Sequence, residues 1–364
     1  MSLSIGIVGL PNIGKSTLFN ALTNNNILAA NYPFATIEPN TGVVPIPDER
    51  LEKLALLYDN PKIIPATVKF TDIAGLVAGA SRGEGLGNQF LSHIRECGAI
   101  AQVIRAFQDD NIQHVQGKID PAHDIEIVNT ELVLADVSTV QKKLPKLEKE
   151  AKANPKLKPQ LDFLQKIFNQ LNDGKPLFDT VNKKLNANEI DGWLKELQLL
   201  TAKPIIYVFN VDEASLSNKQ TQQKLFELVK PSPAILVCAK LEDELKNLRK
   251  HEVAELLQSY GVEHSGLEQL VKIAYQALNL QSFLTAGDKE VRAWTIKKGS
   301  TAPQAAGVIH GDFERGFIAA EVVDYYDLIE AGSKVVARAR GKIRTEGKTY
   351  IMQPNDIVEF KFNV

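Results

Sequence analysis

A glycine-rich stretch near the start of the chain has the residue types that bind phosphate. Gly9, Gly14, Lys15 and Ser16 stand at the spacing Gly-x-x-x-x-Gly-Lys-Ser, between an apolar run at 5–8 and further apolar residues at helical spacing. This order of strand, loop and helix is the context that a phosphate-binding loop requires. The glycines let backbone N–H groups face an anion at the helix N-terminus, while the lysine reaches the β- and γ-phosphates. The residues expected to hold the nucleotide here are Asn12, Ile13, Gly14, Lys15, Ser16 and Thr17.

Two later segments supply the expected contacts to a metal ion and to the γ-phosphate. Residues 67–72 read as a strand that ends in Asp72, and Gly75 follows shortly after it. In nucleotide switches an aspartate at this place holds Mg²⁺, usually through water, and the glycine N–H meets the γ-phosphate. Thr36 lies in the loop between the two motifs and is available as a further ligand. The expected metal ligands are Ser16, Thr36 and Asp72, and the expected catalytic residues include Lys15 and Gly75.

The segment expected to read the base departs from the common GTPase pattern Asn-Lys-x-Asp, whose aspartate accepts hydrogen bonds from guanine. After the strand 204–209, this chain has Asn210, Val211 and, in the aspartate's place, Glu213. Adenine carries an acceptor at N1, which a carboxylate would repel, and a donor at N6. The longer glutamate side chain can move that charge away, and Asn210 and backbone groups then read N6 and N7. Because hydrogen-bonded sites reject a wrong partner by roughly 10⁴-fold, we interpret the change as relaxed guanine selectivity that favours ATP. The alternative is that Glu213 still binds guanine.

Together these motifs resemble the YchF/Obg-like ATPase family, and the likeness runs from residue 2 to residue 364. The family implies ATP hydrolysis, a helical insertion, a C-terminal TGS domain and association with ribosomes. It also implies a second base contact at Ala239 and Lys240, after the last strand of the sheet. The segments that carry the resemblance are 9–17, 31–40, 72–77, 83–88, 210–213 and 356–364.

Two single residues carry further predictions about catalysis. Leu76 stands where many GTPases have a glutamine that orients water, and an apolar side chain cannot do so. His114, in the polar loop 107–121, is our candidate for this role, because imidazole can orient or deprotonate water near neutral pH. The alternative is a solvated loop histidine. Asn12 is where relatives often bind K⁺ beside the phosphates; the alternative is a hydrogen bond within the loop.

Composition limits the other classes of function. The 364 residues include 44% hydrophobic and 24% charged residues, which predicts a globular protein of two or three domains. The net charge of −2 gives no global polyanion signature, so any nucleic-acid surface is local and no DNA sequence specificity is expected. Two cysteines form no metal spacing or disulfide framework and suit a reducing compartment. Since no stretch approaches the ~20 apolar residues of a membrane span, we expect a cytoplasmic protein.

Alternating apolar strands and helices predict an α/β fold with a parallel sheet, and its ligand at the carboxyl ends of the strands. The strand signal vanishes over 128–199, where helical spacing and a Pro-marked turn predict an antiparallel helical hairpin inserted in the sheet domain. The last part of the chain predicts a small α+β sheet that resembles a ubiquitin-like TGS domain. The expected domains are a P-loop NTPase domain of residues 1–127 and 200–278, a helical insertion of residues 128–199 and a C-terminal domain of residues 279–364.

Two segments concentrate positive charge. Residues 142–158 carry seven lysines against two glutamates, and residues 334–348 carry six basic residues against one glutamate, so each has a net charge of +5. Such a run is usually a solvated face. With the ribosome and its RNA implied as partners, a phosphate-contacting arm is an equal alternative for the first segment, and we interpret the C-terminal domain as a docking module.

Three functions follow from these observations. The first is a Mg²⁺-dependent ATPase that cycles as a ribosome-associated switch; without an evident arginine finger, which contributes about 10³–10⁵-fold, its intrinsic turnover should be slow. The second is a GTPase acting in ribosome assembly or translation. The third is a non-enzymatic module in which nucleotide gates a surface for RNA or protein. We favour the first.

Overall fold

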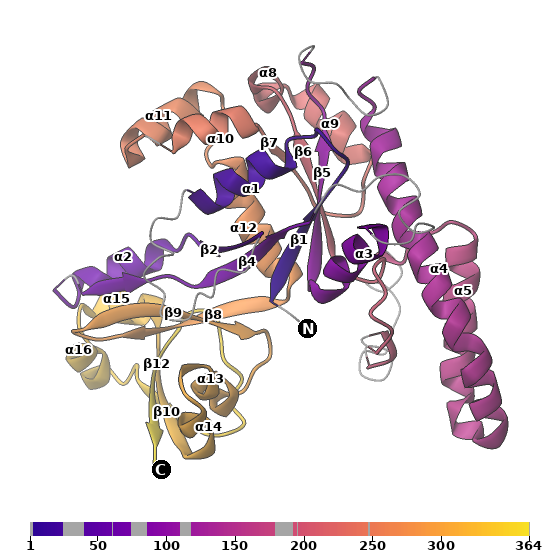
Figure 1. Ribbon diagram of the computed structural model, residues 1–364. Helices are drawn as coiled ribbons and strands as arrows, with labels where there is room; N and C mark the ends of the chain where they lie inside the picture. The colour runs from indigo at the N-terminus through magenta and orange to yellow at the C-terminus, as the bar shows by residue number, and fades with distance from the viewer. Residues whose placement is uncertain are drawn as a thin grey trace. The chain divides into compact units, whose positions relative to one another are not determined.

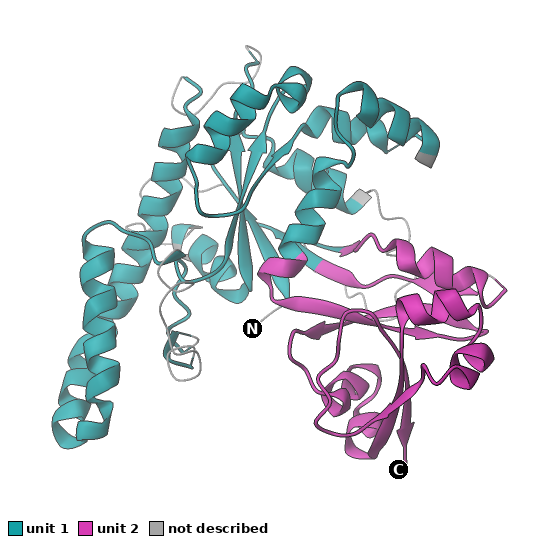
Figure 2. Cartoon of the chain, turned by 180° about the vertical axis from the view of Figure 1, so that it is seen from behind, with its two compact units in different colours: residues 1–43, 69–274 teal, residues 44–68, 275–364 magenta. Residues whose placement is uncertain are grey.

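The chain forms two compact units, which Figure 2 colours separately. Unit 1 contains residues 1–43 and 69–274, and unit 2 contains residues 44–68 and 275–364. Segment 44–68 therefore groups with the C-terminal part of the chain, although the sequence interpretation included it in the N-terminal domain. The computed structural model describes residues 3–24, 40–59, 61–73, 86–109, 118–178, 192–194, 196–246 and 248–363.

The first of two six-stranded sheets positions the predicted site. Its strands are β1 (Ser4–Val8), β2 (Thr41–Pro45), β4 (Thr67–Asp72), β5 (Ala99–Arg105), β6 (Ile205–Asn210) and β7 (Ala234–Val237). Their order is β2-β4-β1-β5-β6-β7, and the pairings from β4 through β7 are all parallel. Every residue of β1, β5 and β6 is buried, as expected for parallel strands covered on both faces. The predicted parallel α/β sheet is confirmed.

The helices of unit 1 follow the strands in the alternation that the sequence predicts (Figure 1). The phosphate-loop helix begins at Lys15, and Leu18 N–H donates its first helical hydrogen bond to Gly14 O at 2.9 Å. Its buried Leu18 and Leu22 face the core, so burial holds the helix N-terminus at the end of β1. The bounds are α1 (Lys15–Asn24), α3 (Leu86–Glu96), α8 (Glu213–Ser217), α9 (Lys219–Glu227), α10 (Ala239–Leu245), α11 (Lys250–Ser259) and α12 (Gly266–Ala277).

The helical hairpin consists of α4 (Pro121–Ala153) and α5 (Lys158–Asn172), which lie side by side in Figure 1. Asp120 caps α4 by accepting a hydrogen bond from His123 N–H, and a proline occupies the first turn. Asn154 and a short 3₁₀ turn, Pro155–Leu157, join the two helices, as the proline-marked turn predicted. Apolar residues from both helices form their shared core, among them Val140, Leu147, Leu164, Ile167 and Leu171.

A buried carboxylate fixes the root of this hairpin where the chain returns to the sheet. Asp136 of α4 is fully buried and accepts hydrogen bonds from Leu200 N–H and Thr201 N–H, both at 2.8 Å. The Thr201 hydroxyl donates a third at 2.7 Å. Burial raises the pKa of Asp136, and these three donors oppose that shift. The carboxylate therefore ties α4 to the segment that leads into β6.

The second sheet belongs to unit 2 and has the order β11-β10-β12-β8-β9-β3. The β8–β9, β10–β12 and β10–β11 pairs are antiparallel, whereas β12–β8 and β3–β9 are parallel. A single antiparallel bridge joins Ile351 to Thr301. The strands are β3 (Lys62–Ile64), β8 (Leu280–Ala286), β9 (Glu290–Lys297), β10 (Phe317–Asp324), β11 (Arg344–Glu346) and β12 (Asp356–Phe362).

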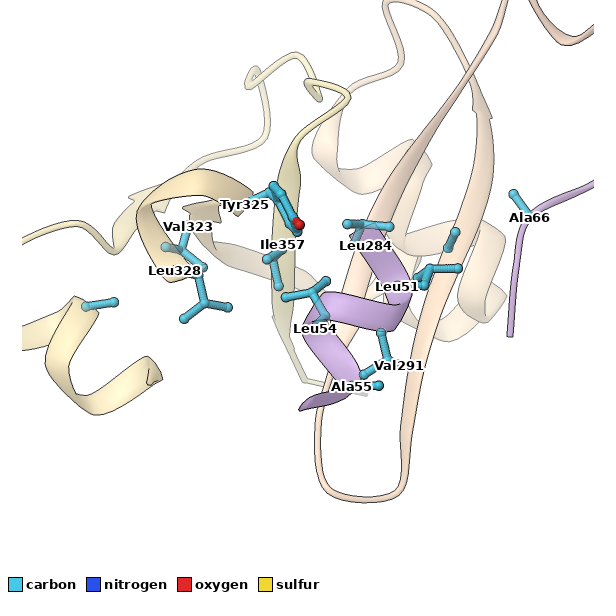
Figure 3. Packing of buried hydrophobic residues seen from close by; sticks show 12 residues of the cluster. Leu51, Leu54, Ala55, Ala66, Leu284, Val291, Val323, Tyr325, Leu328 and Ile357 are labelled. Carbon is cyan, nitrogen blue, oxygen red and sulfur yellow. The ribbon is translucent and has the colours of Figure 1, made fainter. Parts of the chain in front are cut away.

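Several helices pack against this sheet. Segment 44–68 contributes α2, whose Leu51 and Leu54 pack against Leu284, Val291 and Ile357 of the strands (Figure 3). A second apolar cluster forms where α13 meets the strands. Because α2 supplies part of the unit 2 core, residues 280–363 do not form that core alone. The helices are α2 (Glu49–Leu56), α13 (Ala302–Ile309), α14 (Gly311–Arg315), α15 (Tyr325–Ala331) and α16 (Lys334–Ala339).

Candidate functional site

The loop between β1 and α1 has the backbone that the glycine spacing predicts. Gly14 adopts φ 88°, and Asn12 is also left-handed with φ 61°. A Cβ atom on Gly14 would lie 2.4 Å from Asn210 Nδ2, so no other residue fits here without displacing that side chain. The loop leads directly into the first turn of α1, where helical N–H groups have no intrahelical acceptor. This is the arrangement in which backbone N–H groups bind a phosphate.

Lys15, Ser16 and Asp72 converge from two elements at the carboxyl edge of the sheet. The Lys15 ammonium donates to Ile73 O at 2.7 Å and lies 3.2 Å from Asp72 Oδ1. The Ser16 hydroxyl donates to the other carboxylate oxygen, Oδ2, at 3.2 Å. The pairing of β1 with β4 in parallel register brings these residues together, because both strands end at the same edge. The sequence predicted this cluster from motif order alone.

The same cluster fits a magnesium ion. Asp72 Oδ1 is buried; it pairs with the Lys15 ammonium but accepts no hydrogen bond from any described residue. A carboxylate and a serine hydroxyl are the hard oxygen ligands that Mg²⁺ takes, and the nucleotide supplies the rest. In the parts of the chain that the structure describes, no group of three or more His, Cys, Asp or Glu side chains could hold a metal by itself. The donors present therefore suit a metal that arrives with a phosphate.

Asn210 joins the phosphate loop to the segments expected to read the base. Its side-chain Nδ2 donates to Ile13 O at 3.0 Å, and its Oδ1 accepts from Ala239 N–H at 3.2 Å. The side chain is only 3% exposed. Sequence reasoning gave Asn210 a role on the base, but not this link between three loops. Removing the Asn210 side chain would leave the Ala239 N–H and the Ile13 carbonyl without these partners. We therefore expect Asn210 to hold the three loops of the site in place.

The other predicted base contacts differ in accessibility. Val211 is 2% exposed and its N–H donates to Val237 O at 2.9 Å, so its side chain lies in the core. Asp212 caps α8 by accepting from Ser215 N–H. Glu213, the first residue of that helix, accepts a hydrogen bond from the Lys240 ammonium at 2.9 Å. That ion pair lowers the pKa of Glu213 and raises the pKa of Lys240.

An open hollow of about 440 Å³ lies beside these residues, between α1 and α10. Its lining includes Thr17, Ala239 and Lys240, three residues that the sequence placed at the nucleotide. A second cavity, of about 280 Å³, lies on the other side of α10 and is lined mainly by apolar residues of β7 and the helices around it. No phosphate-loop residue lines that second cavity, so the first is the candidate nucleoside site. Glu242, which lines the second cavity, is buried and accepts a hydrogen bond from Leu267 N–H; burial raises the pKa of Glu242 to about 7.

Three predicted site residues lie outside the described residues. They are Thr36, Gly75 and His114, and their roles stay predictions. Within the described chain, no helix is both long and apolar enough to cross a membrane.

Comparison with known proteins identifies the family. A family model described as "50S ribosome-binding GTPase" matches residues 4–135, and the YchF-GTPase_C model, described as "Protein of unknown function (DUF933)", matches residues 280–363. The "Ribosome-binding ATPase YchF" of Bacillus subtilis is 49% identical, with 100% of each chain covered. "Obg-like ATPase 1" of Gallus gallus is 46% identical and covers 100% of this chain and 93% of its own length.

A solved structure agrees with these sequence relatives. The YchF GTPase of Schizosaccharomyces pombe superposes with a TM-score of 0.85 at 39% identity, over 98% of this chain and 97% of that one. The names of the relatives divide between ATPase and GTPase, so they do not decide which purine is bound. Full-length identity near one half, together with the phosphate-loop geometry, confirms the resemblance seen in the sequence: the chain belongs to the YchF/Obg-like ATPase family.

Proposed function

We propose that this protein is a Mg²⁺-dependent nucleoside triphosphatase that hydrolyses ATP in preference to GTP and acts as a ribosome-associated switch. The observation that carries the proposal is the convergence of Lys15, Ser16 and Asp72 within 3.2 Å beneath a glycine loop. The Bacillus subtilis relative, named a ribosome-binding ATPase, supports nucleotide hydrolysis and association with ribosomes. Association with ribosomes would also place the protein in the cytoplasm.

Each residue has a distinct task in this proposal. Lys15 and the loop N–H groups neutralise phosphate charge, while Ser16 and Asp72, with Thr36, hold Mg²⁺. When bound, the metal withdraws charge from the phosphate oxygens and orients them. Gly75 senses the γ-phosphate and His114 orients the attacking water.

On the base side, Asn210 orders the loops around the purine, and Ala239 and Lys240 line the hollow that receives it. Val211 is buried, so any contribution from it is to the shape of the pocket floor. Glu213, in place of the aspartate that reads guanine, is engaged by Lys240. This engagement supports a preference for adenine. Asn12, with its left-handed backbone, is our proposed K⁺ contact.

The purine preference is tested by displacement of a fluorescent ADP analogue from the full-length protein by ATP and by GTP. We expect ATP to displace the probe at lower concentration. If GTP binds as well or better, the protein is a GTPase, the activity for which its Schizosaccharomyces pombe relative is named.

Turnover is tested by single-turnover hydrolysis of ATP. The reaction is measured with and without Mg²⁺, with and without ribosomes, and with K⁺ replaced by Na⁺. We expect loss without Mg²⁺, slow intrinsic hydrolysis, acceleration by ribosomes and slower hydrolysis in Na⁺. His114→Ala should abolish most turnover while nucleotide affinity persists. Absence of hydrolysis under all these conditions, with nucleotide still bound, would favour the non-enzymatic module instead.

A further inference from the structure

The base-side loops carry an ion pair whose position bears on purine choice. Glu213 follows β6 and Lys240 follows β7, and these strands are adjacent and parallel, with Asn210 paired to Val237. The two side chains therefore meet at the carboxyl edge of the sheet, where Glu213 Oε1 accepts from Lys240 Nζ at 2.9 Å. Lys240 also lines the candidate nucleoside hollow. The pair thus stands where a purine edge is expected.

We propose that Lys240 sets the purine preference of this site by holding the Glu213 carboxylate away from the base. The inference rests on the proposed adenine preference and names the residue responsible for it. It makes Lys240 a specificity-determining residue that acts through its neighbour, in addition to any contact of its own with the ring.

The chemistry of the two purines explains the effect. Guanine needs a carboxylate that accepts from N1–H and from the exocyclic amino group at once. Here the carboxylate is shared with the Lys240 ammonium and, secondly, with the backbone N–H of Glu213 itself, and both interactions lower the pKa of Glu213. Adenine has no donor at N1, so it loses nothing when the carboxylate is engaged. A carboxylate whose negative charge is balanced by the Lys240 ammonium also repels the adenine N1 lone pair less.

Exposure decides how such a pair behaves. The Lys240 side chain is 74% exposed and that of Glu213 is 28% exposed. Exposed ion pairs contribute little to the free energy of folding, so a substitution of Lys240 frees the carboxylate without disturbing the fold. Freed, it can form charge-assisted hydrogen bonds with guanine. The effect of removing Lys240 should therefore appear in the ratio of affinities for the two purines and not in stability.

The test is a double-mutant cycle on the full-length protein. Dissociation constants for fluorescent ribose-labelled ADP and GDP are measured for wild type, Lys240→Met, Glu213→Gln and the double variant. We expect Lys240→Met to shift the ADP-to-GDP preference toward guanine by about tenfold, the effect of one gained charge-assisted hydrogen bond. In the Glu213→Gln background the same lysine change should shift the ratio little, because the charged acceptor is gone.

Two further variants separate this role from a general one. Lys240→Arg keeps a cation on Glu213 and should retain the wild-type ratio. Lys143→Met removes a comparable ion pair, Lys143 to Glu196 at 2.7 Å in the hairpin, and should leave both affinities unchanged.

Three outcomes would overturn the inference. An unchanged ratio in Lys240→Met removes Lys240 from purine choice. An equal shift with and without the Glu213 carboxylate means that Lys240 acts on the base directly. Loss of both affinities by the same factor means that it only supports binding. A wild type that prefers GDP overturns the proposed ATP preference instead, and the coupling between the two residues is still read from the same cycle.

Discussion

Two basic segments with the same net charge of +5 differ in what surrounds their cations. In the hairpin tip, residues 142–158, five of the seven lysines form no ion pair with any described residue: Lys142, Lys149, Lys152, Lys156 and Lys158. In the C-terminal basic segment, residues 334–348, five of the six basic residues lie within ion-pair distance of an acidic side chain of unit 2: Lys334 of Glu359 and Glu321, Arg338 of Glu321, Arg340 of Glu330, Lys342 of Asp327 and Arg344 of Glu346 and Asp356. The first set of cations faces solvent and the second faces carboxylates.

The comparison shows that the net charge of a segment does not by itself determine the electrostatic potential at its surface. Attraction of RNA phosphate depends on cations whose charge no nearby carboxylate cancels. The hairpin tip meets this condition and the C-terminal segment does not. We therefore expect the hairpin tip to supply the electrostatic part of ribosome binding, and we interpret the C-terminal segment's cations as structural. The docking role predicted for the C-terminal domain would have to rest on other residues.

The strongest test of the comparison is to replace four hairpin lysines with glutamine: Lys142, Lys149, Lys152 and Lys156. We expect ribosome affinity to fall roughly a hundredfold at low salt and the slope of log affinity against log salt to decrease by about three. Co-sedimentation with ribosomes over a series of KCl concentrations measures both. Unchanged affinity, or a salt-independent wild type, would contradict an RNA-facing hairpin.

The next test removes Asp356, a buried carboxylate that contacts the C-terminal basic segment through Arg344. Asp356 is 2% exposed; it accepts from Gln353 N–H at 2.7 Å and from the Tyr350 hydroxyl, and Arg344 lies 3.9 Å away. Asp356→Ala leaves these donors without their acceptor, so we expect a loss of about 2 kcal/mol in the free energy of unfolding of the unit that contains it. Urea denaturation measures it. Asp162→Ala, on the exposed hairpin surface, is the control and should change stability by less than about 0.5 kcal/mol. Equal losses would mean that the two regions do not differ as described.

A matched set of substitutions in the C-terminal segment should give the opposite pattern to the hairpin set. Changing Lys334, Arg338, Arg340 and Lys342 to glutamine removes as many charges as the hairpin variant. We expect ribosome affinity to change less than about threefold, and stability to fall by about 1 kcal/mol, since each exposed ion pair contributes little. A drop in affinity as large as that of the hairpin variant would restore the C-terminal segment as an RNA-binding surface.

The phosphate half of the site was predictable because its residues follow local rules. Gly14, Lys15 and Ser16 are fixed by the spacing of one loop, and Asp72 follows because parallel strands end at the same edge. The hairpin was also predictable from periodicity, although α4 begins at Pro121, ahead of the expected residue 128.

What could not be predicted depends on contacts between distant parts of the chain. Arg50 of α2 donates to Pro354 O at 2.6 Å across 304 residues, and no local pattern in 44–68 announces that partner. In the same way, the carboxylates that cancel the C-terminal cations come mostly from β10, β12 and α15, outside the segment whose charge was counted. The pairing of Lys240 with Glu213 follows only once β6 and β7 are known to be neighbours.

The smallest expected effect is a dependence of folding stability on acid pH, which we expect where the C-terminal basic segment pairs with carboxylates. A hydrogen bond from Lys334, and to a smaller extent one from Lys361, lowers the pKa of Glu359 from 4.5 to about 2. A carboxyl whose pKa is lower in the folded than in the unfolded chain stabilises the fold above the unfolded pKa, and this contribution is lost as pH falls from about 4.5 toward 2. Because the Glu359 side chain is 47% exposed, solvent screening limits the contribution to less than about 1 kcal/mol. Glu359→Gln should therefore be slightly less stable than wild type at pH 6, and the difference in urea midpoint should shrink as the pH is lowered to 3. A difference that stays constant with pH would mean that Glu359 acts through packing and not through its charge.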